Sequence, residues 1–470
     1  MKPLLLEDAT RDAWDVILVG TSFAACFFAY SLKGRGLRVL MVERGPFIDR
    51  DTQLDRRLEG NPQTVRQTNT SGRRKDWAAR HQFGGGSNCW WGNTPRLLPS
   101  DFEMRTRYGV AQDWTLTYNE LEPYLSKAEA LMDVAGSDRA GLAPRSAPFP
   151  FPAHAPTRAE RQLFSADASW QPMPCARSNG GRRAVCCAAG SCSLCPIDAK
   201  FTILNAIDLF EDEKFFFVTD TECLTVETTG GTATGVVVRD TDQVLHTLRA
   251  DFVGLAANPI SNAEILLRSG LGGALVGRGL HEQVGQFLWL DIPFDNYYGG
   301  TSISGVGYGF YDGDFRKDAA SVLIESWNSP PSLRLERGKW LQRLKLKFIA
   351  EDLPLPDNRV VLDGGEAVVN WSGHSDYAYA GLARAREKLP EIIPFEFENL
   401  RFGEFEPTEA HIIGGTPMAA TAADGVVDKD CRLFDVPNVA CLGAGVFPTG
   451  AAANPTLTLS ALSLYAGAQL

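Results

Sequence analysis

The sequence predicts an α/β protein in which a Rossmann-like domain carries an inserted α+β domain built on an antiparallel sheet. Residues 15–20 (DVILVG) form a short apolar strand pattern ending in glycine, residues 21–33 indicate a helix, and residues 37–42 indicate a second strand. Residues 216–256 alternate in β fashion, and residues 284–407 hold many aromatics and strand-like runs. A βαβ opening followed by further blocks of strands favours two domains.

Length and composition allow this architecture and exclude several others. The chain has 470 residues, 44% of them hydrophobic, which suffices for two substantial cores. With 57 acidic and 46 basic residues its formal charge is −11, so we expect no nucleic-acid partner. No run approaches the roughly 20 apolar residues of a transmembrane helix. The first residues lack the apolar core of a secretory signal, which predicts a cytoplasmic protein or one co-exported to the periplasm with a partner.

The remaining segments suggest where the domains divide. Residues 51–80 are polar and predict a long loop over a ligand, and residues 135–183 predict an irregular excursion. Helices are predicted within residues 114–134, over residues 262–268, and from Asn454-Pro455 onward. The first domain is assigned residues 1–100, 199–290 and 408–470, and the second is assigned residues 101–198 and 291–407.

The first strand is followed by a degraded dinucleotide motif. The turn reads Gly20-Thr21-Ser22-Phe23-Ala24-Ala25, and Glu43 ends the second strand 23 residues after Gly20. Small residues let the backbone approach a pyrophosphate at the positive end of the helix, while the carboxylate accepts ribose hydroxyls. Ser22 and Ala25 replace the second and third glycines of GxGxxG. An ordinary tight β–α turn is therefore the alternative.

Several segments together resemble the glucose-methanol-choline (GMC) flavoprotein oxidoreductases, nearly from end to end. The C-terminal pair, HIIGGTPM followed by FPTGAAANPTLT, is the most specific part, because order, spacing and residue types all agree with that family. The resemblance implies an FAD-binding first domain and a substrate-binding second domain. The segments that carry it are residues 84–103, 276–283, 354–362, 411–418 and 438–462.

The resemblance also implies a catalytic pair. His411, in HIIGGT, takes the position of the base, although an isolated histidine is more often structural. A neutral imidazole with a pKa near working pH suits removal of the hydroxyl proton while a hydride passes to the flavin. Asn454 takes the partner position, where its amide can donate to the substrate oxygen. Capping of the last helix is a compatible role for Asn454.

FAD is expected to contact the first turn, the glycine run and the last helix. Glycines in residues 84–92 let backbone amides lie against the flavin, and the helix from Pro455 directs its positive end toward the ring. Cys89 stands where some relatives carry a covalently bonded His, so we expect noncovalent FAD, with a cysteinyl bond as the alternative. The expected contacts are Gly20, Ser22, Phe23, Ala25, Glu43, Arg44, Gly85, Gly86, Ser87, Asn88, Cys89, Trp91, Gly92, Ala444, Gly445, Asn454, Pro455 and Thr456.

Four of the ten cysteines lie between Cys186 and Cys195, a density that indicates metal or redox chemistry. Residues 185–200 (VCCAAGSCSLCPIDAK) are similar to the cysteine segment of bacterial sugar and polyol dehydrogenases of this family that carry an iron–sulfur cluster. The last two cysteines are separated by one residue fewer than expected for those enzymes. A [3Fe-4S] cluster on Cys187, Cys192 and Cys195, with Cys186 spare, is the implied centre. Zinc, a Cys192–Cys195 disulfide and free thiols are the alternatives.

The resemblance therefore implies an FAD-dependent dehydrogenase that oxidises a CH–OH group of a sugar, glycoside or polyol. An O2-using oxidase of the same fold, a redox-neutral flavin-binding lyase and a noncatalytic metal-binding module are the alternatives. The expected partners are a small-molecule alcohol and an electron-acceptor protein or small subunit.

A basic strip in the second domain suggests a docking surface for an acceptor or a membrane. Its basic residues are interleaved with Leu and Trp340, and a solvated strand or helix face is the favoured interpretation. The strip consists of Arg334, Arg337, Lys339, Arg343, Lys345 and Lys347.

Overall fold

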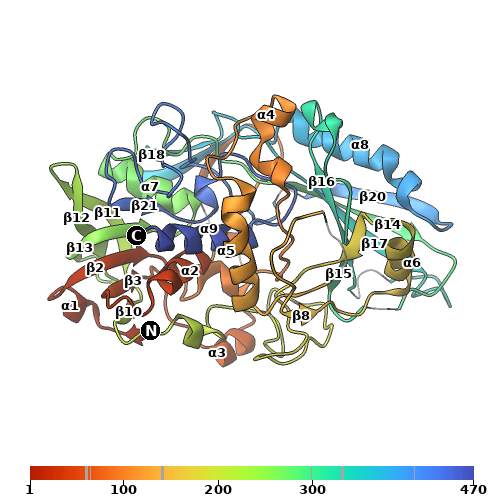
Figure 1. The fold of residues 1–470 in the computed structure, drawn as a ribbon, viewed down its shortest axis with the longest axis horizontal. Helices are drawn as coiled ribbons and strands as arrows, with labels where there is room; N and C mark the ends of the chain where they lie inside the picture. The colour runs from red at the N-terminus through yellow and green to blue at the C-terminus, as the bar shows by residue number, and fades with distance from the viewer. Residues whose placement is uncertain (59–61, 64, 139–141, 298, 330–332, 407) are drawn as a thin grey trace.

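The protein has two large sheets side by side, as a computed structural model shows (Figure 1). The sheet that begins the chain lies at the left of Figure 1, and the second lies at the right. The predicted α/β class is therefore confirmed. The structure describes residues 1–58, 62–63, 65–138, 142–297, 299–329, 333–406 and 408–470.

The first sheet has eight strands in the order β1-β10-β3-β2-β13-β12-β11, with β21 paired to β13. The pairs β2–β3, β2–β13 and β3–β10 are parallel, whereas β11, β12 and β13 form an antiparallel meander. Strands covered on both faces are continuously apolar, as in β3. The strands are β1 Lys2–Pro3, β2 Ala13–Val19, β3 Val39–Val42, β10 Phe215–Val218, β11 Glu222–Thr229, β12 Thr232–Arg239, β13 Leu245–Leu255 and β21 Val439–Cys441.

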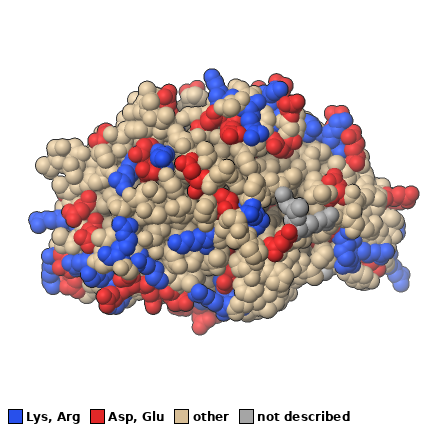
Figure 2. All heavy atoms as spheres, viewed as in Figure 1, with Lys and Arg blue, Asp and Glu red and all other residues tan. Residues whose placement is uncertain are grey.

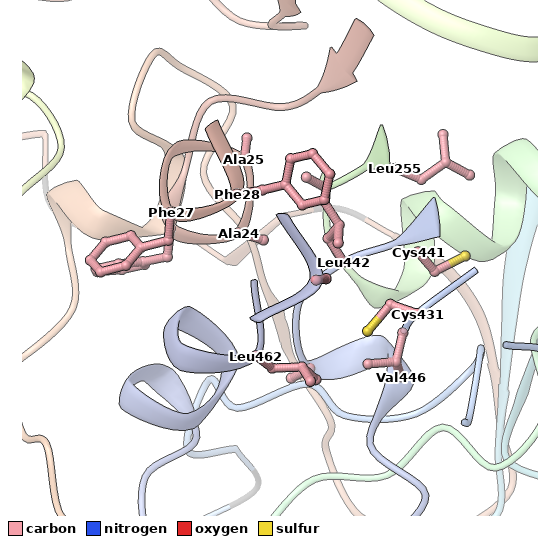
Figure 3. Packing of buried hydrophobic residues seen from close by; sticks show 14 of the residues in the cluster. Ala24, Ala25, Phe27, Phe28, Leu255, Cys431, Cys441, Leu442, Val446 and Leu462 are labelled. Atoms are coloured by element: carbon pink, nitrogen blue, oxygen red, sulfur yellow. The ribbon is translucent and has the colours of Figure 1, made fainter. Parts of the chain in front are cut away.

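Two helices from opposite ends of the chain pack together beside this sheet. These are α2 (Phe23–Leu32) and α9 (Thr456–Ala468), and both are buried over most of their length. Figure 3 shows Phe27, Phe28 and Leu462 in this core, close to Leu442 beyond β21. A Cβ on Gly467 would lie 2.6 Å from the carbonyl oxygen of Phe28, so glycine allows the close approach.

The second sheet has six antiparallel strands in the order β20-β14-β17-β16-β15-β9, as predicted for the inserted part. One face packs against α8 (Asp376–Ile392) and α6 (Arg158–Ala166) through a separate apolar core. The division of the chain into domains remains a prediction, and β14 crosses its boundary at residue 290. The strands are β9 Trp170–Pro172, β14 Val284–Asp291, β15 Ile303–Phe310, β16 Val322–Trp327, β17 Arg343–Ala350 and β20 Glu398–Glu406.

Residues 51–80 differ from the predicted long loop. Within this stretch β5 pairs with β19, about three hundred residues later, and a partner so distant leaves no local pattern. Residues 59–61 and 64 of the predicted loop lie outside the described residues. The elements here and in their partner sheet are α3 Arg50–Asp55, β4 Pro62–Gln63, β5 Arg66–Asn69, β6 Trp77–Ala78, β18 Arg359–Asp363 and β19 Glu366–Trp371.

The predicted helices are present, and two of them begin with side-chain caps. Thr117 and Glu120 form a capping box at the start of α5 (Tyr118–Leu131), and the Asn258 side chain caps α7 (Pro259–Ser269). The excursion over residues 135–183 holds more regular structure than predicted, because a capping box also starts α6. The remaining elements are α1 Leu6–Ala9, α4 Met104–Tyr108, β7 Ala135–Gly136 and β8 Phe151–Pro152.

Charges of both signs are interspersed on the face that Figure 2 shows. No helix among the described residues is both long enough and apolar enough to cross a membrane.

Candidate active site

A long hollow leads from the first βα turn to the six-stranded sheet. Its nucleotide end has a volume of about 240 Å³ and its substrate end about 430 Å³. Phe23, Arg80 and Gly86 line both ends, so the two cavities adjoin, and together they are called the hollow. This arrangement suits a dinucleotide cofactor with a small molecule beside it.

The nucleotide end is built from the first turn. Gly20 has φ +106°, and a Cβ there would lie 2.6 Å from the carbonyl oxygen of Ala256, so only glycine fits. The Thr21 hydroxyl donates to Glu43 Oε2 at 2.6 Å and accepts from the Gly84 amide at 3.0 Å. Burial raises the pKa of Glu43 to about 7. The glycine cradle, the amino end of α2 and the carboxyl group fit the diphosphate and ribose of FAD.

Thirteen of the expected FAD contacts border the hollow. Those at the nucleotide end are Gly20, Ser22, Phe23, Glu43, Arg44, Gly85, Gly86 and Ala444. Those at the substrate end, besides Phe23 and Gly86, are Cys89, Trp91, Gly92, Asn454 and Thr456. The other five are buried without bordering either end: Ala25, Ser87, Asn88, Gly445 and Pro455.

Two of these five have a visible supporting role. The Ser87 hydroxyl donates to the Gly84 carbonyl at 2.6 Å, and the Asn88 amide donates to the Phe83 and Gly85 carbonyls. These bonds hold the glycine run in its short 3-10 turn, Gly85–Asn88. Thr21, which joins this run to Glu43, was missing from the predicted contacts.

His411 and Asn454 meet at the substrate end although they are far apart in the chain. The His411 Nδ1 atom lies 2.6 Å from Gln283 Oε1. The Gln283 Nε2 atom donates to the carbonyls of Ala451 and Ala453, which fixes the orientation of the amide. The Gln283 oxygen must therefore accept from Nδ1–H, which leaves the lone pair of His411 on Nε2.

The electrostatic surroundings keep this imidazole neutral. Burial lowers the pKa of His411 to about 4; the Glu282 carboxylate opposes this shift, and the Lys347 ammonium adds to it. This pKa is lower than the predicted value near working pH. The Glu282 carboxylate also accepts from the His411 backbone amide at 2.9 Å, which holds the loop in place.

Asn454 does not cap the last helix. Among the described residues, no hydrogen-bond partner is found for its buried Oδ1 atom, and α9 begins at Thr456 without a side-chain cap. A buried carboxamide oxygen that borders a cavity and has no partner among the described residues indicates that a ligand donates a hydrogen bond to it.

Sequence reasoning missed four charged residues at the substrate end: Arg80, Glu325, Lys347 and Glu409. Lys347 Nζ lies 2.7 Å from Glu409 Oε2, and burial raises the pKa of Glu409 to about 7 against the effect of Lys347. The basic strip was interpreted as a solvated face, but Lys345 and Lys347 are buried. The alternation of charged and apolar residues along β17 was the available signal, because it indicates two differently occupied faces.

Known proteins share this architecture. The sequence model of the GMC oxidoreductase family matches residues 378–463. The fructose dehydrogenase large subunit of Gluconobacter japonicus is 26% identical, covering 96% of this chain and 96% of the relative. The 6'''-hydroxyparomomycin C oxidase of Streptomyces lividus is 28% identical, covering 98% and 92%. A formate oxidase crystal structure superposes with a TM-score of 0.68 at 16% identity, covering 97% of each chain. Residues 378–463 therefore match the GMC oxidoreductase family, and the chain is similar to the named relatives over nearly its whole length.

GMC oxidoreductases are FAD-dependent enzymes that act on CH–OH donors, and this agrees with the hollow described above. The catalytic and cofactor-binding roles of individual residues remain predictions. His411, the proposed base, and Asn454, its partner, line the same cavity as Gly86 and Gly92 of the glycine run.

The cysteine segment borders a separate small cavity. Cys186, Cys187, Cys192 and Cys195 all line it. The Ser302 hydroxyl lies 2.9 Å from Cys192 Sγ, and the Ala199 amide donates to Cys195 Sγ at 3.3 Å. All four are free thiols, and Cys187 is exposed. Within the described parts of the chain, no three side chains are grouped as ligands of one metal ion, so we derive no step through a metal centre.

Two buried cations lie near the cysteine segment. Lys200 Nζ donates to the carbonyls of Asn88, Trp90 and Ser193. Burial lowers the pKa of Lys200 to about 8. The Arg177 guanidinium donates to neutral acceptors, among them the Asn93 side chain at 2.7 Å. Neither cation forms an ion pair with a carboxylate of the described residues. Burial raises the pKa of the Cys192 thiol, and the Arg177 guanidinium opposes this shift.

Proposed function

We propose that this protein is a dehydrogenase of the GMC family that oxidises a CH–OH group of a sugar, glycoside or polyol, with His411 as the base. The observation that carries the proposal is the fixed tautomer of His411, which leaves the Nε2 lone pair available in the cavity that Asn454 also lines. Such a base must reach the hydroxyl proton directly.

The chain's own residues divide the work of proton removal. FAD, when bound, accepts the hydride from the carbon atom. His411 Nε2 takes the hydroxyl proton, and the Asn454 carboxamide orients the alcohol and stabilises the negative charge that develops on its oxygen. Gln283 holds the imidazole in its basic tautomer, and the Glu282 carboxylate stabilises the imidazolium that forms.

A sugar or polyol substrate is favoured by the walls of the cavity. The rings of Trp91 and Trp327 lie with their centroids 4.8 Å apart and border the substrate end. Aromatic rings suit the C–H faces of sugars, while buried charged groups suit their hydroxyls. The named relatives, a fructose dehydrogenase subunit and an oxidase of a hydroxylated aminoglycoside, act on compounds of this kind.

The test is anaerobic mixing of the FAD-loaded enzyme with a panel of sugars, glycosides and polyols. Bleaching of the flavin absorbance by at least one alcohol, followed by reoxidation with a dye, is the expected result. Absence of bleaching across the panel would contradict the proposal. Stoichiometric peroxide in air without a dye would identify an oxidase, and product without bleaching would identify a lyase.

The finer cofactor assignments are also proposals. We infer noncovalent FAD, because the Cys89 thiol is protonated: burial raises its pKa. Acid precipitation should then release the yellow colour into the supernatant. For a [3Fe-4S] cluster on Cys187, Cys192 and Cys195, the support is the donor chemistry and the two nearby cations. Iron and sulfide analysis, with electron spin resonance of the oxidised protein, decides this point.

We further propose that a partner subunit or protein accepts the electrons. The support is that one relative is itself named a large subunit. Co-purification of a second chain from the native source, with faster dye reduction in its presence, is the expected result.

A further inference from the structure

The face of the six-stranded sheet that borders the substrate end carries charged and aromatic side chains. The opposite face carries apolar side chains. Leu344, Leu346 and Phe348 of β17 belong to the apolar core beneath α8. Lys347 points to the other face, where Glu325 of β16 is its direct cross-strand neighbour. The alternation of β17 therefore builds a polar wall for the substrate end.

Burying these charges is costly unless something compensates for the lost water. Glu325 is 2% exposed and Lys347 is 7% exposed. Each oxygen of Glu325 has one donor: Asn93 Nδ2 to Oε1 at 2.7 Å and Trp327 Nε1 to Oε2 at 2.9 Å. Since a carboxylate oxygen can accept more than one hydrogen bond, both oxygens keep an acceptor position.

We propose that Glu325 and Lys347 bind neighbouring hydroxyls of an uncharged sugar or polyol. This inference rests on the proposed function and assigns its substrate class. A carboxylate accepts from two hydroxyls, and an adjacent ammonium donates to a hydroxyl oxygen. The Trp91 and Trp327 rings supply the apolar surface for the carbon skeleton.

The contact between Glu325 and a hydroxyl is tested with deoxy analogues of the best neutral substrate. In the wild type, the analogue that lacks the bound hydroxyl should lose roughly 10- to 100-fold in kcat/KM. In Glu325→Gln, the discrimination between the parent sugar and that analogue should shrink to a few-fold. Glu404→Gln, an exposed substitution on β20 of the same sheet, is the matched control and should leave the discrimination unchanged.

The outcomes separate this inference from the proposed function. If no alcohol bleaches the wild-type flavin, the proposed function fails and the inference fails with it. If neutral sugars bleach the flavin but Glu325→Gln discriminates deoxy analogues as the wild type does, only the inference is overturned.

Discussion

The two ends of the hollow are built in different ways. The nucleotide end consists of backbone and small side chains from a few contiguous stretches, with Gly20 pressed against Ala256 and Thr21 linking Glu43 to the glycine run. The substrate end consists of long charged and aromatic side chains from β16, β17 and the segments around residues 411 and 454. The first end is shaped by local chain geometry, whereas the second exists only after distant strands have paired.

The largest effect is expected from removing the proposed base, which should slow the chemical step and leave cofactor binding intact. His411→Ala should lower the rate of anaerobic flavin reduction by about 10²- to 10⁴-fold, because the base is lost while the nucleotide end is untouched. Stopped-flow absorbance measures the rate, and the FAD content of the purified variant should remain that of the wild type. His246→Ala, which removes a histidine paired with Asp240 on the meander, should retain the full rate. A loss of FAD in His411→Ala would mean that His411 at the substrate end also supports cofactor binding.

A smaller effect is expected from changing the tautomer without removing the base. Gln283→Leu frees Nδ1 and should slow flavin reduction by roughly 10- to 100-fold through misorientation. Gln283→Glu retains an acceptor and adds a negative charge, which should raise the pKa of His411 above its present value of about 4. The acid limb of the pH–rate profile should therefore move to higher pH in Gln283→Glu. An unshifted limb would show that Gln283 does not set the state of His411.

The contrast between the ends also explains what the sequence could predict. Gly20, Glu43 and the glycine run are positioned by short contiguous segments, so their pattern is sufficient for a local prediction. The family resemblance supplied His411 and Asn454, since neither residue has a local signature of its function. Glu325 and Lys347 become neighbours only through the β16–β17 register, and Glu409 reaches Lys347 from another segment. No window of sequence contains that arrangement.

The position of FAD at the nucleotide end can be tested with a variant that fills part of the cavity without disturbing the fold. A Cβ on Gly86 would meet no atom within 4 Å, yet Gly86 lines both ends of the hollow. Gly86→Ala should leave the melting temperature of the cofactor-free protein unchanged and weaken FAD binding by about tenfold through overpacking against the cofactor. Titration with FAD, followed by fluorescence quenching, measures the affinity. Unchanged affinity would place the cofactor away from this glycine.

The smallest expected effect is on the pH dependence of the free energy of unfolding. It is measured for one buried carboxyl group from each end of the hollow. Burial raises the pKa of Glu409 from 4.5 to about 7, so the folded state binds more protons than the unfolded state between these values. The stabilisation from this group is full below pH 4.5 and is lost as the pH rises through 7.

Glu409→Gln should therefore remove a decline of about 1–3 kcal/mol in the free energy of unfolding between pH 4.5 and 7. Glu43→Gln should act with the same sign, because burial raises the pKa of Glu43 to about 7 as well. Urea unfolding of the cofactor-free proteins at pH 5 and pH 8 measures the difference. His411, whose pKa is lowered, contributes in the opposite direction in every variant and cancels in the comparison with the wild type. If Glu409→Gln shifts stability equally at both pH values, Lys347 holds Glu409 ionised throughout, and the wall carries its full negative charge below neutral pH.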